Sequence, residues 1–217
     1  MTAPTADIRT GDALPLLADQ RGAFASVFTS LPDAAEMGLE GPAWAAWFAQ
    51  AARLTVEAVT PKGYAIFYQT DRRADGRLRS KAGLVIEAAQ AVGASVVWHK
   101  IAVATEGTSL FRPAFTHLLA VSVRGKSAKP TPDVFPIGPK VYPNATDEAS
   151  LDVGLGFLAG KGVGWIADPF CGRGSIARAA ASRYGMGSLS VDVDPGQVDA
   201  ARALLAPHAT VTDGGRP

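Results

Sequence analysis

The chain has one cysteine, Cys171, among 217 residues, no long uninterrupted apolar run, and no excess of charge of one sign. A single thiol excludes a disulfide framework and a cysteine-rich zinc site, and it fits a reducing compartment. The most apolar stretch, residues 42–59, is interrupted by Gln50, Arg53 and Glu57, which favours a core helix over a membrane span. The opening MTAPTADIRTGDALP lacks the regions of a signal peptide. We therefore expect a cytoplasmic protein with no membrane partner and no bound metal.

Charge and composition exclude two further classes. The 21 lysines and arginines nearly balance 20 acids, giving a net charge of +1, so the chain is no uniformly basic nucleic-acid coat. Hydrophobic residues make up 47%, which excludes a disordered chain. A chain of this length buries roughly 70% of its unfolded surface, which is enough for one self-sufficient core. We expect a single domain over residues 1–217.

Short apolar runs typical of buried strands alternate with segments of helical spacing. This alternation predicts an α/β fold with a mostly parallel sheet. Two of the strands follow one another without an intervening helix, which predicts one antiparallel pair at an edge. Residues 124–144 are rich in proline and glycine and predict a long loop. The predicted strands are 24–29, 64–69, 94–103, 117–123, 163–167, 188–193 and 209–212, and the predicted helices are 12–19, 42–59, 81–92, 147–158, 174–184 and 195–205.

The most informative segment is a glycine-rich turn, WIADPFCGRGSIARAAASRYGMGSLSVDVDP. A strand ends in Asp168, the turn leads into a helix at Ser175, and the next strand ends in Asp192. Glycines let a backbone approach a ligand closely, and the free N–H groups at a helix start bind polar groups. An acid after the second strand is suited to accept two hydrogen bonds from a ribose. The segment predicts a nucleotide-type cofactor at the carboxyl edge of the sheet.

Two cofactor classes fit this geometry. The spacing Gly172-x-Gly174-x-x-Ala177, with Asp192 about 20 residues further on, matches the dinucleotide fingerprint. However, only 43 residues follow Gly174, whereas a dinucleotide fold opens with this turn and needs several later strands. The Asp168-Pro169-Phe170 run is also foreign to that fingerprint.

The runs DPFCGRGS and SVDVDP resemble the S-adenosyl-L-methionine-binding motif of methyltransferases, in the version found in nucleic-acid amino-methyltransferases. The resemblance implies a Rossmann-like methyltransferase fold, with helices on both faces of the sheet. It places Asp168 near the methionine part of the cofactor and Asp192 on the ribose. The cofactor-binding residues that it implies are Asp168, Pro169, Phe170, Cys171, Gly172, Gly174, Asp192 and Val193.

The order of the motifs is unusual, because most methyltransferases begin with the cofactor turn. Here it comes last, which resembles the circularly permuted DNA methyltransferases of the β type. The opening IRTGDALPLL and the later THLLAVSVRGK resemble the start and the end of the catalytic half in that family. We accordingly expect a catalytic half at 1–123, a connector at 124–144 and a cofactor-binding half at 145–217.

The family's catalytic motif is Asp, Asn or Ser, then two prolines, then an aromatic residue that stacks on the extruded base. Ser30-Leu31-Pro32-Asp33 occupies that place, so Ser30 keeps the hydrogen-bonding role while Asp33 replaces the aromatic. Asp33, with Glu36 one turn later, either orients or deprotonates the acceptor or merely caps a turn. The predicted catalytic residues are Ser30, Pro32, Asp33 and Glu36, and the methylated atom stays open.

Two basic groups predict phosphate contacts, although solvated loops are often charged as well. The first group follows a strand end and consists of Arg72, Arg73, Arg77, Arg79 and Lys81, with Asp71 as a possible second acid of the site. The second group consists of Arg124, Lys126, Lys129 and Lys140. Three aromatics in irregular segments are candidates for stacking on a base: Phe111, Phe115 and Tyr142.

The substrate is predicted from length alone. At 217 residues there is no room for a separate target-recognition domain, which favours structured RNA as the partner. The alternatives are a DNA adenine or cytosine amino-methyltransferase, a small-molecule methyltransferase, and a non-catalytic module that binds the cofactor. The oligomeric state is not predicted.

Overall fold

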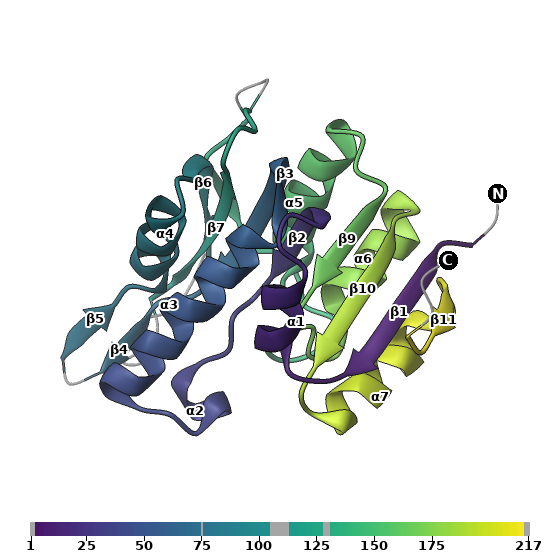
Figure 1. Ribbon diagram of the computed structural model, residues 1–217, viewed down its shortest axis with the longest axis horizontal. Helices are drawn as coiled ribbons and strands as arrows, with labels where there is room; N and C mark the ends of the chain where they lie inside the picture. The colour runs from purple at the N-terminus through teal and green to yellow at the C-terminus, as the bar shows by residue number, and fades with distance from the viewer. Residues whose placement is uncertain (1–2, 75, 105–112, 128–130, 215–217) are drawn as a thin grey trace.

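A nine-stranded sheet runs through the computed structural model, which describes residues 3–74, 76–104, 113–127 and 131–214 (Figure 1). The strands lie in the order β11-β1-β10-β9-β2-β3-β7-β6-β8. Strand β7 runs antiparallel to its neighbours, β3 and β6, and the other neighbouring pairs are parallel. The strands are β1 (Thr5–Thr10), β2 (Phe24–Thr29), β3 (Val59–Gln69), β6 (Ser95–Val103), β7 (Phe115–Ser122), β8 (Val134–Pro136), β9 (Trp165–Asp168), β10 (Gly187–Asp192) and β11 (Thr210–Thr212).

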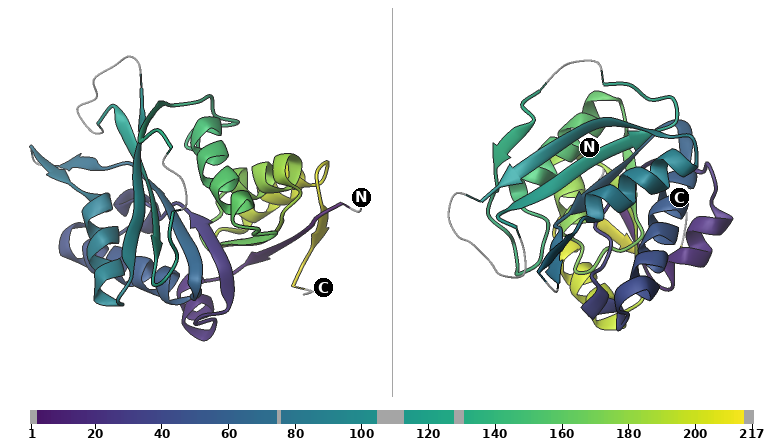
Figure 2. Two further views of the ribbon diagram at one scale, coloured as in Figure 1. Left: turned by 90° about the horizontal axis from the view of Figure 1, so that it is seen from above. Right: turned by 90° about the vertical axis from the view of Figure 1, so that its left-hand side faces the viewer.

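Helices cover both faces of the sheet, as the resemblance implied (Figures 1 and 2). One face carries α1 (Ala13–Asp19), α3 (Gly41–Glu57) and α4 (Lys81–Ala91). The other carries α5 (Glu148–Gly160), α6 (Ser175–Tyr184) and α7 (Pro195–Leu205). No described helix is both long and apolar enough to cross a membrane. The α/β architecture with a mostly parallel sheet and antiparallel pairing toward one edge is therefore confirmed, and this pairing involves β7 with both β3 and β6.

Local sequence explains where the helices begin. The side chain of Ser80 accepts a hydrogen bond from the Gly83 N–H at 3.0 Å and so caps α4. Asp147 accepts from the Ser150 N–H at 3.0 Å and caps α5 in the same way. Each face then buries its own apolar cluster, with Phe48 of α3 at the centre of one. Phe28, Leu155 and their neighbours form the other. Burial of these side chains holds the two helical layers on the sheet.

Several short elements lie outside the predicted pattern. The strand β1 was missed although Asp7 and Arg9 alternate with Ala6 and Ile8, and Asp7 is buried and ion-paired with Arg9. The segment predicted as an irregular connector contains β8. This strand pairs with β6 on the side away from β7 and forms one edge of the sheet. A two-stranded hairpin, β4 (Arg72–Ala74) and β5 (Arg77–Arg79), and the single-turn helix α2 (Ala34–Met37) were also missed. Strands of three residues are too short to show a period.

The topology brings the two ends of the chain together. Strand β1 lies between β10 and β11, and β9, which leads into the glycine turn, pairs with β2. The carboxyl ends of β10, β9, β2 and β3 therefore share one edge of the sheet. In open parallel sheets this edge is where ligands bind.

Candidate active site

The glycine turn and the Ser30–Asp33 loop meet at the centre of this edge. The hydroxyl of Thr29, the last residue of β2, donates a hydrogen bond to Asp168 Oδ1 at 2.7 Å. Both residues are buried. The predicted cofactor and acceptor segments, about 140 positions apart in sequence, are thus linked directly, and Ser30 follows the linking residue.

Asp168 carries an unsatisfied oxygen. The residue is 1% exposed, and its Oδ2 atom is fully buried and makes no hydrogen bond within the described residues. Burial raises the pKa of Asp168 to about 7, and the negative charge of Asp192 adds to this effect. The Thr29 hydroxyl and the nearby Phe170 amide oppose it by favouring the ionised form. A cationic ligand group that reached Oδ2 would satisfy this oxygen and favour the carboxylate.

The turn itself is held by Asp192. One carboxylate oxygen accepts from the Gly172 N–H at 2.8 Å, and the other accepts from the Asp194 N–H at 3.0 Å. Gly172 has a φ of +51°, and a Cβ there would meet nothing within 4 Å, so the turn leaves open space beside it. The open side and the partly exposed carboxylate form the place where a ribose would lie according to the resemblance.

Gly174 is required for a different reason. Its φ is +78°, and a Cβ would lie 2.9 Å from Leu205 of α7. The glycine lets α6 begin close against α7. Val193, beside Asp192, is 68% exposed and offers an apolar surface at the rim of the turn.

The remaining turn residues pack inward. Pro169 is buried, and the Phe170 ring meets Trp47 of α3 edge-on at 5.8 Å. Burial raises the pKa of the Cys171 thiol, with Asp168 and Asp192 adding to the effect, so the thiol stays protonated. The Cys171 N–H donates to the Val191 carbonyl at 2.9 Å, which gives this residue a structural place in the turn.

Tyr142 is a site residue that sequence reasoning placed only among stacking candidates. It comes from the connector, and the Arg173 guanidinium lies 5.6 Å from its ring centroid. Burial raises the pKa of its hydroxyl, which lies against Ser175 at the start of α6 and near Asp168. The end of the connector therefore covers the glycine turn. Phe111, another stacking candidate, lies outside the described residues.

The loop after β2 presents Ser30 beside the Thr29–Asp168 contact. Within the described part of the chain, nothing hydrogen-bonds to the Ser30 hydroxyl. The next residue, Leu31, is buried in the core of the α3 face, and the Pro32 carbonyl accepts from Trp44 Nε1 at 3.4 Å. Leu31 thus anchors the loop, and Ser30 is left available to an acceptor.

Asp33 is held by two cations. One carboxylate oxygen accepts from Arg72 at 2.7 Å, and the other pairs with Lys81, whose side chain is 5% exposed. Burial disfavours ionisation, but Lys81 and Arg72 outweigh it and lower the pKa of Asp33. A carboxylate held in this way is a weak proton acceptor. Glu36 is exposed and accepts from the Asp33 N–H at 2.6 Å, as in the capping box of α2. The two ion pairs of its carboxylate argue against Asp33 as a general base.

Asp71 and Lys81, which the sequence predicts as substrate-binding residues, are both buried and bind other parts of the protein. Asp71 is 2% exposed; it accepts from the Lys81 N–H at 2.8 Å and lies 3.2 Å from His117 Nε2. His117 Nδ1 lies 2.9 Å from His99 Nε2, which extends the polar chain from β7 to the half-buried His99 on β6. Burial and this histidine pair also hold the pKa of His99 below its ordinary value. Asp71 therefore braces the start of α4, and Lys81 neutralises Asp33.

The remaining residues of the first basic group lie on the β4–β5 hairpin. Arg73, Arg77 and Arg79 are exposed, and none forms an ion pair within the described residues. The second group is divided. Arg124 follows β7, and its N–H donates to the Pro61 carbonyl at the opposite edge of the sheet. Lys140 lies 5.9 Å from the ring centroid of Tyr68, near the carboxyl end of β3. Lys129 lies outside the described residues.

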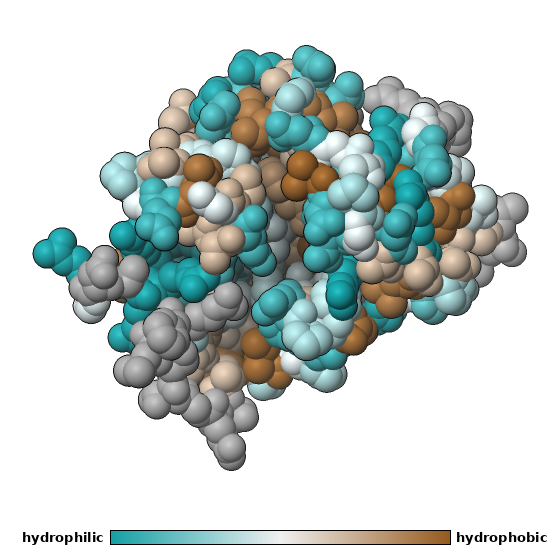
Figure 3. Space-filling view, turned by 90° about the horizontal axis from the view of Figure 1, so that it is seen from below, coloured by the Kyte–Doolittle hydropathy of each residue, from teal (hydrophilic) through white to brown (hydrophobic). Residues whose placement is uncertain are grey.

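Seen from the carboxyl edge, the surface is hollowed near its centre, with hydrophilic side chains gathered on the side of the hairpin (Figure 3). The strand order, the antiparallel β7 and the glycine turn at this edge define a Rossmann-like methyltransferase fold. No protein-family model matches the chain, and no curated protein matches it in sequence.

Solved structures with this fold include a provisionally assigned DNA modification methylase of Thermus thermophilus in complex with S-adenosyl-L-methionine. It is 19% identical, has a TM-score of 0.70, and the alignment covers 98% of this chain and all of that one. The cytosine-N4-specific PvuII DNA methyltransferase is 14% identical with a TM-score of 0.67, over all of this chain and 91% of that one. The M1.HpyAVI–SAM complex is 14% identical with a TM-score of 0.58, over 92% of this chain and 98% of that one.

Proposed function

We propose that this chain is an S-adenosyl-L-methionine-dependent methyltransferase that acts on an exocyclic amino group of a DNA base. The observation that carries the proposal is the Thr29–Asp168 contact, which joins the glycine turn to the Ser30 loop at the edge of the sheet. Two of the similar structures were solved with S-adenosyl-L-methionine, and one is a cytosine-N4-specific DNA methyltransferase.

The residues present fit the cofactor. The unsatisfied Oδ2 of Asp168 suits the ammonium group of the methionine part. The Asp192 carboxylate is partly exposed beside the open Gly172 and suits a ribose diol, while exposed Val193 suits the face of an adenine ring. When bound, S-adenosyl-L-methionine supplies a methyl group on a sulfonium, which an amine lone pair attacks while the sulfur keeps the electrons of the breaking bond.

The chain contributes mainly position and polarity. The Ser30 hydroxyl would accept a hydrogen bond from the target amino group and direct its lone pair toward the glycine turn. Because Asp33 is held by Lys81 and Arg72, the proton that leaves the methylated nitrogen passes to water and not to Asp33. The exposed hairpin arginines would contact phosphates.

DNA is the better-supported substrate, and the preference for structured RNA is not supported. That preference rested on the absence of room for a target-recognition domain. The alignment covers all of the Thermus chain and 91% of the PvuII chain, so proteins of similar extent include named DNA methylases. Short length therefore carries no argument for RNA.

The permuted order belongs to the same proposal. We infer a catalytic half at 1–123, a connector at 124–144 and a cofactor-binding half at 145–217, with Ser30-Leu31-Pro32-Asp33 as a variant of the catalytic motif. The pairing of early β2 with late β9 supports this division, because it makes one crevice from two distant segments.

The test combines cofactor binding with product identification. Calorimetry with S-adenosyl-L-methionine is expected to show binding at one site. Incubation with the methyl-labelled cofactor and unmethylated DNA, with total RNA in parallel, is expected to label DNA. Nucleoside mass spectrometry should then find N6-methyladenine or N4-methylcytosine. Ser30→Ala should slow transfer and leave cofactor affinity unchanged.

The alternatives give different results. Absence of cofactor binding overturns the proposal. Binding without transfer to DNA, RNA or small amines would indicate a non-catalytic module, and label confined to RNA would restore that substrate.

A further inference from the structure

A second pocket lies beside the Ser30–Asp33 loop, between the first turns of α3 and α4 and the hairpin strand β5. It measures about 380 Å³ and is lined by Pro42, Trp44, Ala45 and Leu84, with Arg79 and Ser80 at its mouth. Ligand pockets for small molecules begin at roughly 300 Å³. Nothing in the cofactor turn or the Ser30 loop uses it.

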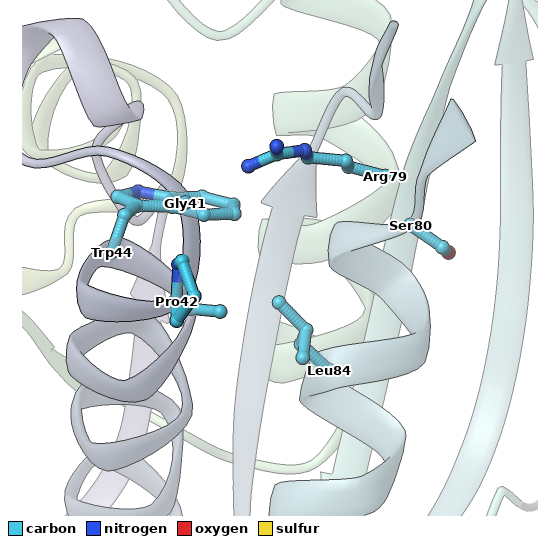
Figure 4. A pocket seen from close by; sticks show the side chains of 7 residues that line it. Gly41, Pro42, Trp44, Arg79, Ser80 and Leu84 are labelled. Atoms are coloured by element: carbon cyan, nitrogen blue, oxygen red, sulfur yellow. The ribbon is translucent and has the colours of Figure 1, made fainter. Parts of the chain in front are cut away.

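The walls of the pocket are apolar and its mouth is cationic. Pro42 and Leu84 face one another across the gap, and the Arg79 guanidinium points toward Trp44 (Figure 4). The Ser80 side chain points away from the gap in the same view. An apolar slot with a guanidinium at its mouth suits a flat neutral ring that is joined to a negatively charged group. A nucleotide has both features.

The pocket is tied to the acceptor loop. Trp44 is 3% exposed and fixed, because its Nε1–H donates to the Pro32 carbonyl at 3.4 Å and its ring packs on Phe48 at 5.1 Å. Lys81, at the start of α4, holds Asp33 of the same loop. The pocket wall and the loop that would present the target base therefore form one unit.

The hairpin brings positive charge to the mouth. Arg72, at its base, is anchored to Asp33, while Arg73, Arg77 and Arg79 are exposed. These exposed cations would attract the phosphates of a strand that enters the acceptor site. A strand following that path would pass its next base over the pocket.

We propose that this pocket binds a nucleobase of the substrate strand that neighbours the target nucleotide, with Arg79 at its edge. The inference rests on the proposed action on DNA and adds a base-binding site beside the acceptor. The pocket also supplies an apolar surface for a base. It lies beside the Ser30–Asp33 loop, in which Asp33 stands in place of the usual aromatic residue. The site would give the enzyme a preference for the sequence next to its target without a separate recognition domain.

The test uses two labelled single strands of equal length, one of ordinary DNA and one with the same phosphates but no bases. Their affinities are measured by fluorescence anisotropy, and the ratio of the two reports base contacts independently of charge. Contact of a base with a protein ring or a guanidinium changes affinity by roughly five- to 150-fold. We expect the wild type to favour the strand with bases by at least about fivefold.

Two pairs of variants locate the contact. Ala45→Phe fills the pocket and should lower the ratio to the part that the target base alone contributes, whereas Ala46→Phe, on the same helix but outside the pocket, should keep the wild-type ratio. Arg79→Ala should lower the ratio. Arg77→Ala removes an equal charge from β5 but lies outside the pocket. It should therefore weaken the affinities for the two labelled DNA strands by the same factor.

The outcomes separate this inference from the proposed function. Equal ratios for Ala45→Phe and Ala46→Phe, with equal melting temperatures, overturn the pocket even where DNA is methylated. A ratio lowered in Ala45→Phe and Arg79→Ala alone supports the pocket even where no methyl transfer is found. Should Ala45→Phe fail to fold, the Arg79 and Arg77 pair decides in the same way.

Discussion

Replacing Asp168 by asparagine should make the protein more stable at neutral pH while it weakens cofactor binding. The carboxyl is 1% exposed, and burial raises its pKa to about 7 from an ordinary value of 3.8. Between these two values the folded protein holds its proton while the unfolded chain releases it. Wild-type stability is therefore unaffected by this group well below pH 4, falls as the pH rises toward 7, and stays at the lower level above that.

The difference in pKa corresponds to about 4 kcal/mol of unfolding free energy at pH 8. Asparagine carries no charge and can still accept from Thr29. The asparagine NH₂ would take the place of Oδ2, which has no hydrogen-bond partner. Leaving these N–H groups buried and unsatisfied costs about 1–3 kcal/mol. Asp168→Asn should thus gain about 1–3 kcal/mol at pH 8, and this advantage should shrink by about 3 kcal/mol on going to pH 4.5.

Urea unfolding at pH 4.5 and pH 8 measures the effect, and calorimetry measures the loss of S-adenosyl-L-methionine affinity. We expect that loss to be about tenfold or more, because a charged hydrogen bond is removed. Asp194→Asn, at an exposed helix cap, is the control and should change stability by less than about 0.5 kcal/mol. A stability difference for Asp168→Asn that is the same at both pH values would refute the reasoning.

Three further predictions concern other parts of the site. Asp33→Asn leaves the buried Lys81 without its carboxylate and should lower the unfolding free energy by about 3–5 kcal/mol in urea titration; an unchanged midpoint would contradict the role of this ion pair. Gly174→Ala should lower the melting temperature more than Gly172→Ala, because both have a positive φ but only Gly174 faces a contact of 2.9 Å. Arg73→Ala should reduce the slope of log affinity for DNA against log salt by about one, and an unchanged slope would place this cation away from the strand.

The cofactor side of the site could be predicted because its parts are local. Asp168, Gly172, Gly174 and Asp192 fall within one strand–turn–helix–strand unit, and the sequence spacing shows their relation directly. The long strands and helices also follow from periodicity. Elements of three or four residues could not be found because they present no period, and β1 was missed although its apolar and polar residues alternate.

The acceptor side could not be predicted to the same depth. Asp33, Arg72 and Lys81 come from three segments, and only the fold shows that they neutralise one another. Sequence reasoning assigned Arg72 and Lys81 to phosphate contacts, because a sequence does not show whether a cation forms an ion pair within the protein. Tyr142 was named only among the candidates for base stacking, because no motif in the proline-rich connector marks the residue that covers the turn.

The position of β1 has a consequence for synthesis on the ribosome. Its neighbours in the sheet, β10 and β11, are translated long after it. Strand β1 must therefore wait without these native partners until residues 187–212 have emerged. Contacts of such large sequence separation form slowly. This part of the sheet should assemble only after these residues have been translated, and nascent chains truncated before residue 187 should remain sensitive to proteases.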